Sequence, residues 1–195
     1  YWGKKTMTPS ALIFYLGINK KIKNVKHHCL FFDKDFNNHF KEIYNTPRWP
    51  SDPLFYASFS SKTNPKTAPK NHENMVLLIP IAPELEDNRF IRNKYFELII
   101  SRFEKITKQS IRNNIIYKRS YAIRDFKKDY NSFKGNAYGL ANTLFQTAIF
   151  KPSIRNKKLK NLFFCGQLTV PGPGVPPAII SGGIVAKEVK KQITS

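Results

Sequence analysis

The sequence predicts a mixed α/β fold, in which short strands and helices alternate and a strand–turn–helix unit closes the chain. Three observations predict it. Short apolar runs bounded by glycine or proline recur, as expected of buried strands. Two longer stretches carry apolar residues at helical spacing. Finally, residues 161–183 pass from an apolar run through a loop rich in glycine and proline into a helical pattern. With 195 residues, 41% of them hydrophobic, the chain can form one domain or parts of two.

The first half is expected to contain four strands and one helix. Residues 11–17 and 29–32 are short apolar runs typical of strands. Asp33 is a candidate N-cap for a helix with Phe36, Phe40, Ile43 and Tyr44 on one face, ended by the prolines at 47 and 50. A strand over 53–59 and a polar loop over 60–73 follow. Residues 75–81 are apolar on both faces, which predicts a central strand antiparallel to the one before it.

The second half begins with the clearest helix, over 87–107, which has acidic residues near its start and lysines at its end. A strand over 114–123 and a short helix over 122–130 are expected next. Glycines at 135 and 139 interrupt the pattern before an apolar stretch over 140–150. The closing unit is predicted as a strand over 162–165, a loop, and a helix from 175 towards 190.

Composition narrows the range of partners. Lys and Arg number 33 against 13 Asp and Glu, a formal charge of +20, but the basic residues are spread along the chain. The simplest interpretation of the basic clusters is that they lie on a solvated surface, and the next is that they bind anionic lipid. A nucleic-acid-binding module is the weakest alternative, because no known recognition pattern accompanies the basic residues. Cys29 and Cys165 are expected to be buried free thiols, and His27 and His28 to be structural, because no metal-ligand spacing occurs. No apolar run is long enough to span a bilayer.

Residues 161–183 carry the features that a ligand would need. Helix N-termini bind negative charge because their first N–H groups lack partners. Pro176 and Pro177 suit a first helical turn, and Gly172 and Gly174 allow close approach to the backbone. Small residues continue along the helix at Gly182, Gly183 and Ala186. Two interpretations stay open from these residues alone: a ligand-facing corner, and a helix packed on a sheet without a ligand. The G-x-G-x-x-G dinucleotide fingerprint is absent.

This block resembles the C-terminal flavin-binding motif of bacterial-type phytoene desaturases, G-x-x-T-x-P-G-x-G-V-P-x-x-x-x-S-G. The matching positions are Gly166, Thr169, Pro171, Gly172, Gly174, Val175, Pro176, Ser181 and Gly182. The resemblance covers nearly the whole chain, since further similar segments are residues 10–17, His27-His28, Phe31-Phe32, residues 52–56, Ala68-Pro69 and residues 135–139.

The resemblance implies a flavoprotein amine-oxidase-like fold and FAD-dependent desaturation of phytoene towards lycopene, with electrons passing to a quinone or oxygen. Residues 1–150 would then contribute to a substrate-binding domain and residues 151–195 to the FAD-binding domain. The helix that begins at Val175 would stabilise charge on the reduced flavin. The implied cofactor-binding residues are Gly166, Gln167, Leu168, Thr169, Pro171, Gly172, Gly174, Val175, Pro176, Pro177, Ser181 and Gly182.

The chain departs from the family pattern in lacking the N-terminal βαβ unit. We therefore expect the C-terminal part of a longer enzyme, which by itself should not hold FAD tightly or turn over. No catalytic residue stands out; Tyr15, His27, His28 and Tyr138 are candidates by polarity alone, and structural roles suit each of them. The expected partners are a carotenoid drawn from the membrane, an anionic membrane surface and the missing FAD-binding portion, not nucleic acid, in a cytoplasmic, peripherally membrane-associated protein. The alternatives within the same fold are a later-step carotenoid desaturase, a carotenoid isomerase or a retinol saturase-like enzyme.

Overall fold

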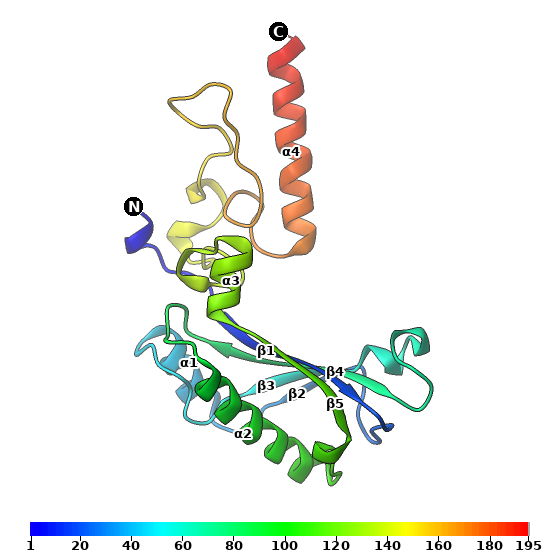
Figure 1. Cartoon of the computed structure of the whole chain (residues 1–195). Coiled ribbons are helices and arrows are strands. Elements are labelled where there is room, and N and C mark those ends of the chain that lie inside the picture. The colour runs from blue at the N-terminus through cyan, green and yellow to red at the C-terminus, as the bar shows by residue number, and fades with distance from the viewer. Residues whose placement is uncertain (195) are drawn as a thin grey trace. The chain divides into compact units, whose positions relative to one another are not determined.

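The computed structural model describes residues 1–194, which divide into two compact units. The sheet unit is Pro9–Gly135; the terminal unit joins Tyr1–Thr8 to the residues from Asn136 onward. Each unit is described by itself. Figure 1 shows the sheet and most helices in the first and the long final helix in the second. The strands and helices together confirm the mixed α/β fold class that the sequence predicts.

The sheet unit is built on five antiparallel strands in the order β2-β3-β4-β1-β5. The prediction of a central strand over residues 75–81, antiparallel to its predecessor, is confirmed. Pro80 is accommodated opposite Ala11 near the end of that strand. The strands are β1 (Ser10–Ile18), β2 (His28–Phe31), β3 (Phe55–Ser58), β4 (Glu73–Ile81) and β5 (Ile115–Tyr121).

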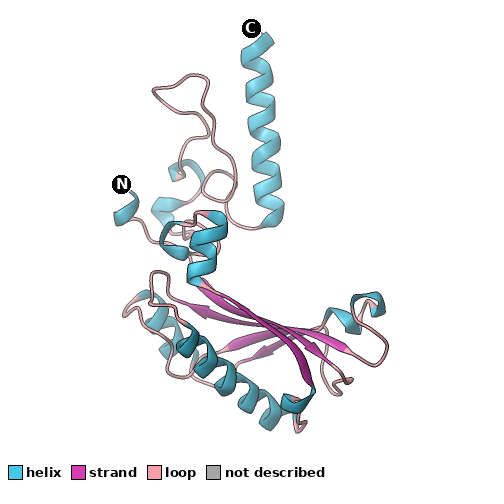
Figure 2. Ribbon diagram, in the orientation of Figure 1, coloured by secondary structure: helices cyan, strands magenta, loops and turns pink. Residues whose placement is uncertain are grey.

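Three α-helices accompany the sheet: α1 (Phe36–Tyr44), α2 (Arg89–Thr107) and α3 (Ile123–Tyr130), drawn in cyan in Figure 2. Helix α2 buries Phe96, Ile99 and Phe103 against the strands, where Phe14 and Phe96 meet edge to face with ring centroids 5.3 Å apart. The large hydrophobic cluster of this unit runs from Leu12 to Ile123, and the terminal unit buries Met7, Leu140 and Ala141 separately. Short 3₁₀ turns complete the chain at Trp2–Lys4, Ser60–Lys62, Pro65–Thr67, Arg112–Asn114, Phe133–Gly135, Leu144–Gln146 and Ala148–Phe150.

Helix α1 corrects two expectations. Its N-cap is Asp35, whose carboxylate accepts the Asn37 N–H at 2.8 Å, whereas Asp33 pairs with Arg102. Of the predicted apolar face only Ile43 is buried, together with His39 and Glu42, whereas the three aromatic side chains of that face are exposed. The polar face can be buried because its groups find partners. Glu42 accepts hydrogen bonds from Arg48 and Ser51, and these replace the water that it loses.

The terminal unit consists of loops, 3₁₀ turns and one helix, α4 (Val175–Thr194). Gln146 is buried and ties the unit's two chain segments together, since it exchanges hydrogen bonds with both the N–H and the carbonyl of Thr6. The strand predicted over 162–165 is wrong: the segment forms one isolated bridge between Phe163 and Arg155. The Leu162 carbonyl accepts the Asn156 N–H and the Phe164 N–H donates to the Ile154 carbonyl around this bridge, but the pairing extends no further.

The two cysteines are both free, as predicted. The expectation that both are buried is wrong, because Cys29 is half-buried and Cys165 is exposed. Cys165 lies in the irregular segment that was expected to be a strand. Without a sheet around it, its side chain stays in solvent.

Candidate functional site

The loop over residues 166–174 is held to the start of helix α4 by a ring of three hydrogen bonds. The Gly166 N–H donates to Ser181 Oγ at 3.0 Å, and the Thr169 hydroxyl donates to the Gly166 carbonyl at 3.0 Å. Thr169 Oγ1 and Ser181 Oγ lie 2.8 Å apart. Because the Thr169 proton is already used, the Ser181 hydroxyl donates in this last bond. Both side chains are buried, so the ring fixes the first turn of the loop to helix α4.

A second predicted segment packs on the same loop. A Cβ added at Gly139 would lie 3.0 Å from Leu168 Cδ2 and 3.3 Å from the carbonyl oxygen of Gln167. Gly139 also has a φ of +88°, which favours glycine. Its N–H donates to Asn136 Oδ1 at 2.5 Å, and its carbonyl accepts the Thr8 N–H at 2.9 Å. The structure therefore brings together residues 136–139 and 167–168, which the sequence could only treat as separate motifs.

The start of helix α4 offers fewer donors than a regular helix N-terminus. Pro176 and Pro177 have no N–H, and the Ala178 N–H already donates to the Gly174 carbonyl at 3.0 Å. Within residues 1–194, the N–H groups of Gly172, Gly174 and Val175 donate no hydrogen bond. These three N–H groups of the loop and helix start therefore have no partner within residues 1–194, and Gly172 is itself buried.

Lys151 is a residue of this site that the sequence did not single out. Its side chain is buried beside Gly172, and its Nζ has no hydrogen-bond partner. Burial lowers the pKa of Lys151 below the ordinary value for a lysine. The sequence carries no signal for this residue, because a lysine after an apolar stretch is normally a surface residue.

The remaining predicted cofactor-binding residues fall into two groups. Gln167 and Leu168 are half-buried under Gly139, whereas Pro171 and Val175 are exposed. The small-residue stretch at Gly182 and Gly183 faces open space, since a Cβ at either position would meet nothing within 4 Å. No group within residues 1–194 approaches that part of helix α4 closely enough to need a glycine.

The candidates chosen by polarity do not gather at this loop. Tyr15, His27 and His28 belong to the sheet unit, and only Tyr138 lies in the terminal unit. His27 and His28 stack on each other with ring centroids 4.0 Å apart. Their Nδ1 atoms hydrogen-bond to Thr63 and to the Tyr56 hydroxyl, respectively. Structural roles account for both histidines.

The loop fits the flavin that the resemblance implies, on three observations. It has free backbone donors at residues 172, 174 and 175, a buried and unpaired Lys151 Nζ, and a rigid hydrogen-bonded first turn. Donors and a positive charge are what an electron-rich ring requires. Within residues 1–194, no helix combines the length and apolar character needed to cross a bilayer.

Comparisons with known proteins identify the family of this chain. The family model described as flavin containing amine oxidoreductase matches residues 26–190. A carotenoid 3,4-desaturase of Haloarcula japonica is 39% identical over 99% of this chain and 39% of its own length. A zeta-carotene-forming phytoene desaturase of Myxococcus xanthus is 29% identical over 95% of this chain and 36% of its own. A 4,4'-diaponeurosporene oxygenase of Staphylococcus haemolyticus is 30% identical over 92% of this chain and 36% of its own length. The chain thus spans less than two fifths of the length of these curated relatives.

Proposed function

This chain belongs to the flavin-containing amine oxidoreductase family, and we propose from this that it is the C-terminal part of an FAD-dependent enzyme that desaturates phytoene towards lycopene. The single observation that carries the proposal is the loop closed by Gly166, Thr169 and Ser181, which holds unpaired donors beside an unpaired lysine. The relatives support the substrate class, because their names describe enzymes acting on carotenoids.

In this proposal the bound flavin would supply the redox chemistry: it would accept a hydride from the carotenoid, which also loses a proton as the double bond forms, and would pass the two electrons to a quinone or oxygen. The chain supplies position and charge. The free N–H groups at 172, 174 and 175 hold the electron-rich part of the cofactor, and the Thr169–Ser181 contact keeps them in place. The buried hydroxyls are used within the loop, so their contribution is to shape it rather than to move a proton.

We further propose that residues 1–150 contribute to the substrate-binding domain and residues 151–195 to the FAD-binding domain. The partner of the second segment would be the portion of an FAD-binding domain that carries the glycine fingerprint. Exposed apolar side chains of this second segment support the assignment, because they lie outside the hydrophobic cluster of the sheet unit. They are Leu159, Phe164, Val175, Ile179, Ile180 and Ile193.

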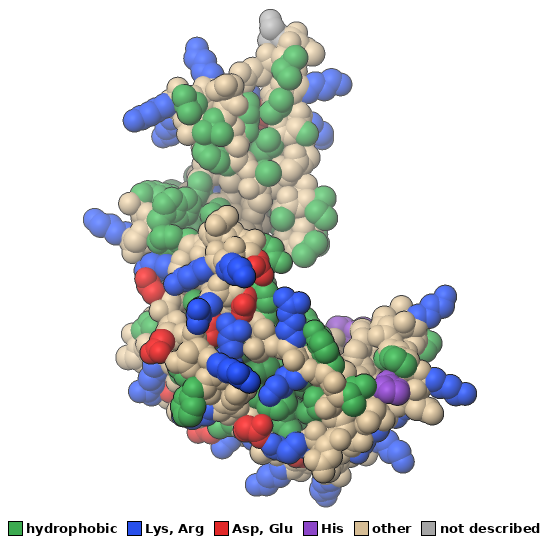
Figure 3. All heavy atoms as spheres, in the orientation of Figure 1, with side chains coloured by type: hydrophobic (Ala, Val, Ile, Leu, Met, Phe, Trp, Pro, Cys, Tyr) green, Lys and Arg blue, Asp and Glu red, His purple; other side chains and the backbone are tan. Residues whose placement is uncertain are grey.

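Peripheral contact with an anionic membrane is the remaining part of the proposal. Phe32, Phe36, Phe40 and Tyr44 form an exposed aromatic stripe, with successive ring centroids 6.3, 6.4 and 4.7 Å apart. Lys34 and Lys41 are exposed in the same segment, and Lys34 pairs with Asp52 at 3.2 Å. Figure 3 shows basic side chains on the face that it draws. Aromatic residues next to lysines are typical of helices that lie in a membrane interface. Such contact would give the enzyme access to a bilayer-dissolved substrate.

A pigment assay tests the catalytic proposal. The full-length protein is expressed in a host that makes only phytoene, and the extracted pigments are separated and identified by their absorption spectra. Lycopene or neurosporene supports the proposal; unchanged phytoene alongside soluble, flavin-loaded protein contradicts it.

A second candidate is a later-step carotenoid desaturase, which the 39% identity to a carotenoid 3,4-desaturase favours. A parallel host that makes lycopene separates the two candidates. Conversion of lycopene to more conjugated products, with phytoene untouched, would identify the later step.

A further inference from the structure

Lys151 has a buried amino group that no group in the described part of the terminal unit neutralises. Its side chain is 7% exposed, and its Nζ finds no hydrogen-bond partner. None of the ion pairs formed by residues 1–194 includes it. Buried lysines are ordinarily paired, because a buried ammonium without a partner is destabilising.

Residues 1–8 and 136–194 hold no spare carboxylate that could pair with this lysine. Among residues 1–8 and 136–194, Glu188 is the only Asp or Glu. Glu188 is already engaged, since it lies 2.5 Å from Arg155 and 3.3 Å from Lys191 on a more open part of the unit. A counter-charge for Lys151 must therefore come from outside the terminal unit.

The position of Lys151 indicates where that counter-charge would lie. A Cβ at Gly172 would come within 3.1 Å of Lys151 Cε and 3.4 Å of Nζ. Gly172 has a φ of +138°, so its lack of a side chain leaves room for both the backbone turn and the lysine. The amino group thus sits against the loop whose N–H groups at 172, 174 and 175 are free.

The first turn of helix α4 offers an anion only a weak positive end. A helix terminus attracts anions through its unpaired N–H groups, and two prolines remove two of them here. Gly174 keeps its own N–H but uses its carbonyl to accept from Ala178. Lys151 is therefore the one full positive charge within reach of the Gly172 backbone that no group in residues 1–194 neutralises.

We propose that Lys151 is a cofactor-binding residue whose ammonium group pairs with the electron-rich part of the bound flavin and stabilises its reduced, anionic form. This inference rests on the proposed function. Lys151 would offset the negative charge that a flavin gains on taking up a hydride, that is, one proton and two electrons. An anion beside Nζ also counteracts the burial that lowers the pKa of Lys151, so the lysine is charged when the cofactor is present.

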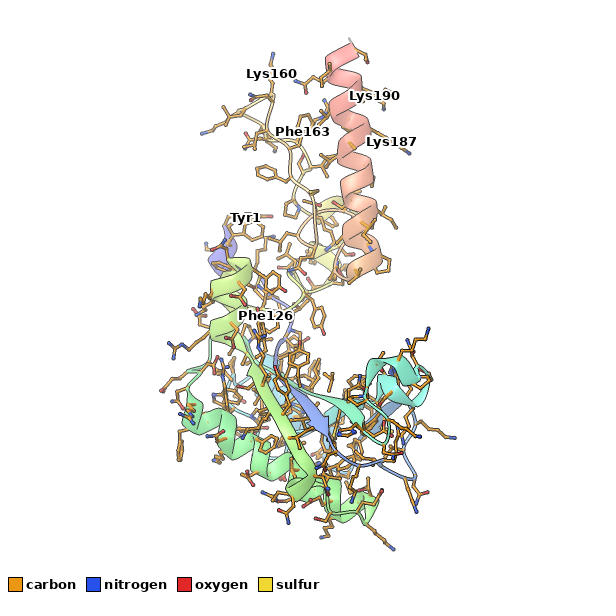
Figure 4. The ribbon with its side chains drawn as sticks, turned by 45° about the vertical axis from the view of Figure 1, so that its right-hand side comes forward. Tyr1, Phe126, Lys160, Phe163, Lys187 and Lys190 are labelled. Carbon is orange, nitrogen blue, oxygen red and sulfur yellow. The ribbon has the colours of Figure 1, made fainter. Side chains whose placement is uncertain are left out.

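The test compares three variants of the full-length, flavin-loaded protein. Lys151→Met removes the charge at similar length, Lys151→Arg keeps it, and Lys187→Met removes an exposed lysine of helix α4, labelled in Figure 4. The reduction potential of the bound flavin is measured with reference dyes. We expect Lys151→Met to weaken the preference for reduced flavin about tenfold, which is ~30 mV more negative for a two-electron couple. The other two variants should match the wild-type protein.

The outcomes separate this inference from the function on which it rests. A wild-type potential in Lys151→Met overturns the role of Lys151, whereas a wild-type protein that holds no flavin overturns the proposed function. Flavin lost from Lys151→Met but retained by Lys151→Arg supports the charge requirement. If Lys151→Met does not fold, acylation of Lys151 in the wild-type protein is followed by mass spectrometry. Protection by bound flavin supports the contact, and equal acylation with and without flavin overturns it.

Discussion

Thr169 and Ser181 are twelve residues apart in the sequence, yet their hydroxyl oxygens lie 2.8 Å apart in a buried contact. Each hydroxyl also bonds to Gly166, one to its carbonyl and the other to its N–H. Hydrogen bonds in a closed ring away from water reinforce one another. The loop between them, with its glycines and prolines, is thereby held to helix α4 although it has no regular secondary structure.

Removing the Ser181 hydroxyl should loosen this loop. Ser181→Ala leaves the Gly166 N–H without its acceptor and one lone pair of Thr169 without its donor, a loss of about 1–3 kcal/mol of local stability. Hydrogen exchange at the Gly166 amide, followed by mass spectrometry, should become faster. Thr169→Ser keeps a hydroxyl and serves as the matched control. Unchanged exchange in Ser181→Ala would show that the ring does not hold the loop.

His39 should make the sheet unit sensitive to mild acid. Its Nδ1 accepts the Leu54 N–H at 3.1 Å and its Nε2 donates to the Pro80 carbonyl at 2.8 Å, so the buried ring is neutral. Burial lowers the pKa of His39 below 6.5. Below about pH 6.5 the unfolded chain therefore binds a proton that the native state does not, and stability falls by at most ~1.4 kcal/mol per pH unit.

Urea unfolding of the chain at several values between pH 5.5 and 7.5 measures this slope. His39→Gln keeps hydrogen-bonding capacity but does not titrate, so its stability should depend less on pH between 5.5 and 6.5. The comparison uses the slopes, since the variant also changes absolute stability. An identical slope in both proteins would assign the acid sensitivity to other groups.

We expect the aromatic stripe to contribute to membrane binding and to contribute little to the stability of the fold. Phe36→Ser with Phe40→Ser removes two side chains that are 57% and 47% exposed, so the free energy of unfolding should change little. Sedimentation with vesicles containing phosphatidylglycerol should fall, and wild-type binding should weaken at high salt. Phe90→Ser is the control, because Phe90 is 77% exposed on helix α2, outside the stripe. Equal vesicle binding by the double variant would exclude the stripe as the contact.

The sheet unit was largely predictable because its strands are apolar runs between breaking residues, and because helix α2 repeats its apolar residues over five turns. Helix α1 shows where the pattern fails. Periodicity identifies two faces but not which one is buried. The polar face is buried because His39 bonds to Leu54 and to the distant Pro80, while Glu42 bonds to the loop that follows the helix. The hydrophobic pattern of the helix does not encode these partners.

The sequence motif of the candidate site was predictable, but its contacts in space were not. Glycines and prolines after residue 165 identify the loop, whereas the false strand at 162–165 arose because an apolar run does not reveal whether a neighbouring strand is present. Lys151 was missed for a related reason. Its burial depends on Gly172, twenty-one residues later, and on packing that charge and spacing do not encode.

A methyl group at Gly139 should disturb the predicted flavin loop from outside it. In Gly139→Ala, the new Cβ would meet Leu168 Cδ2 at 3.0 Å and the Gln167 carbonyl at 3.3 Å, at a φ of +88° that disfavours any Cβ. The side chain of Leu168 can move, but the Gln167 backbone is tied to the Gly166 turn, so we expect a cost of about 1–3 kcal/mol. Limited proteolysis should cut residues 166–174 faster than in the wild-type protein. Gly182→Ala is the matched control, because its Cβ would meet nothing within 4 Å and alanine favours a helix. Equal proteolysis of the two variants would mean that the contact between Gly139 and residues 167–168 does not hold the loop.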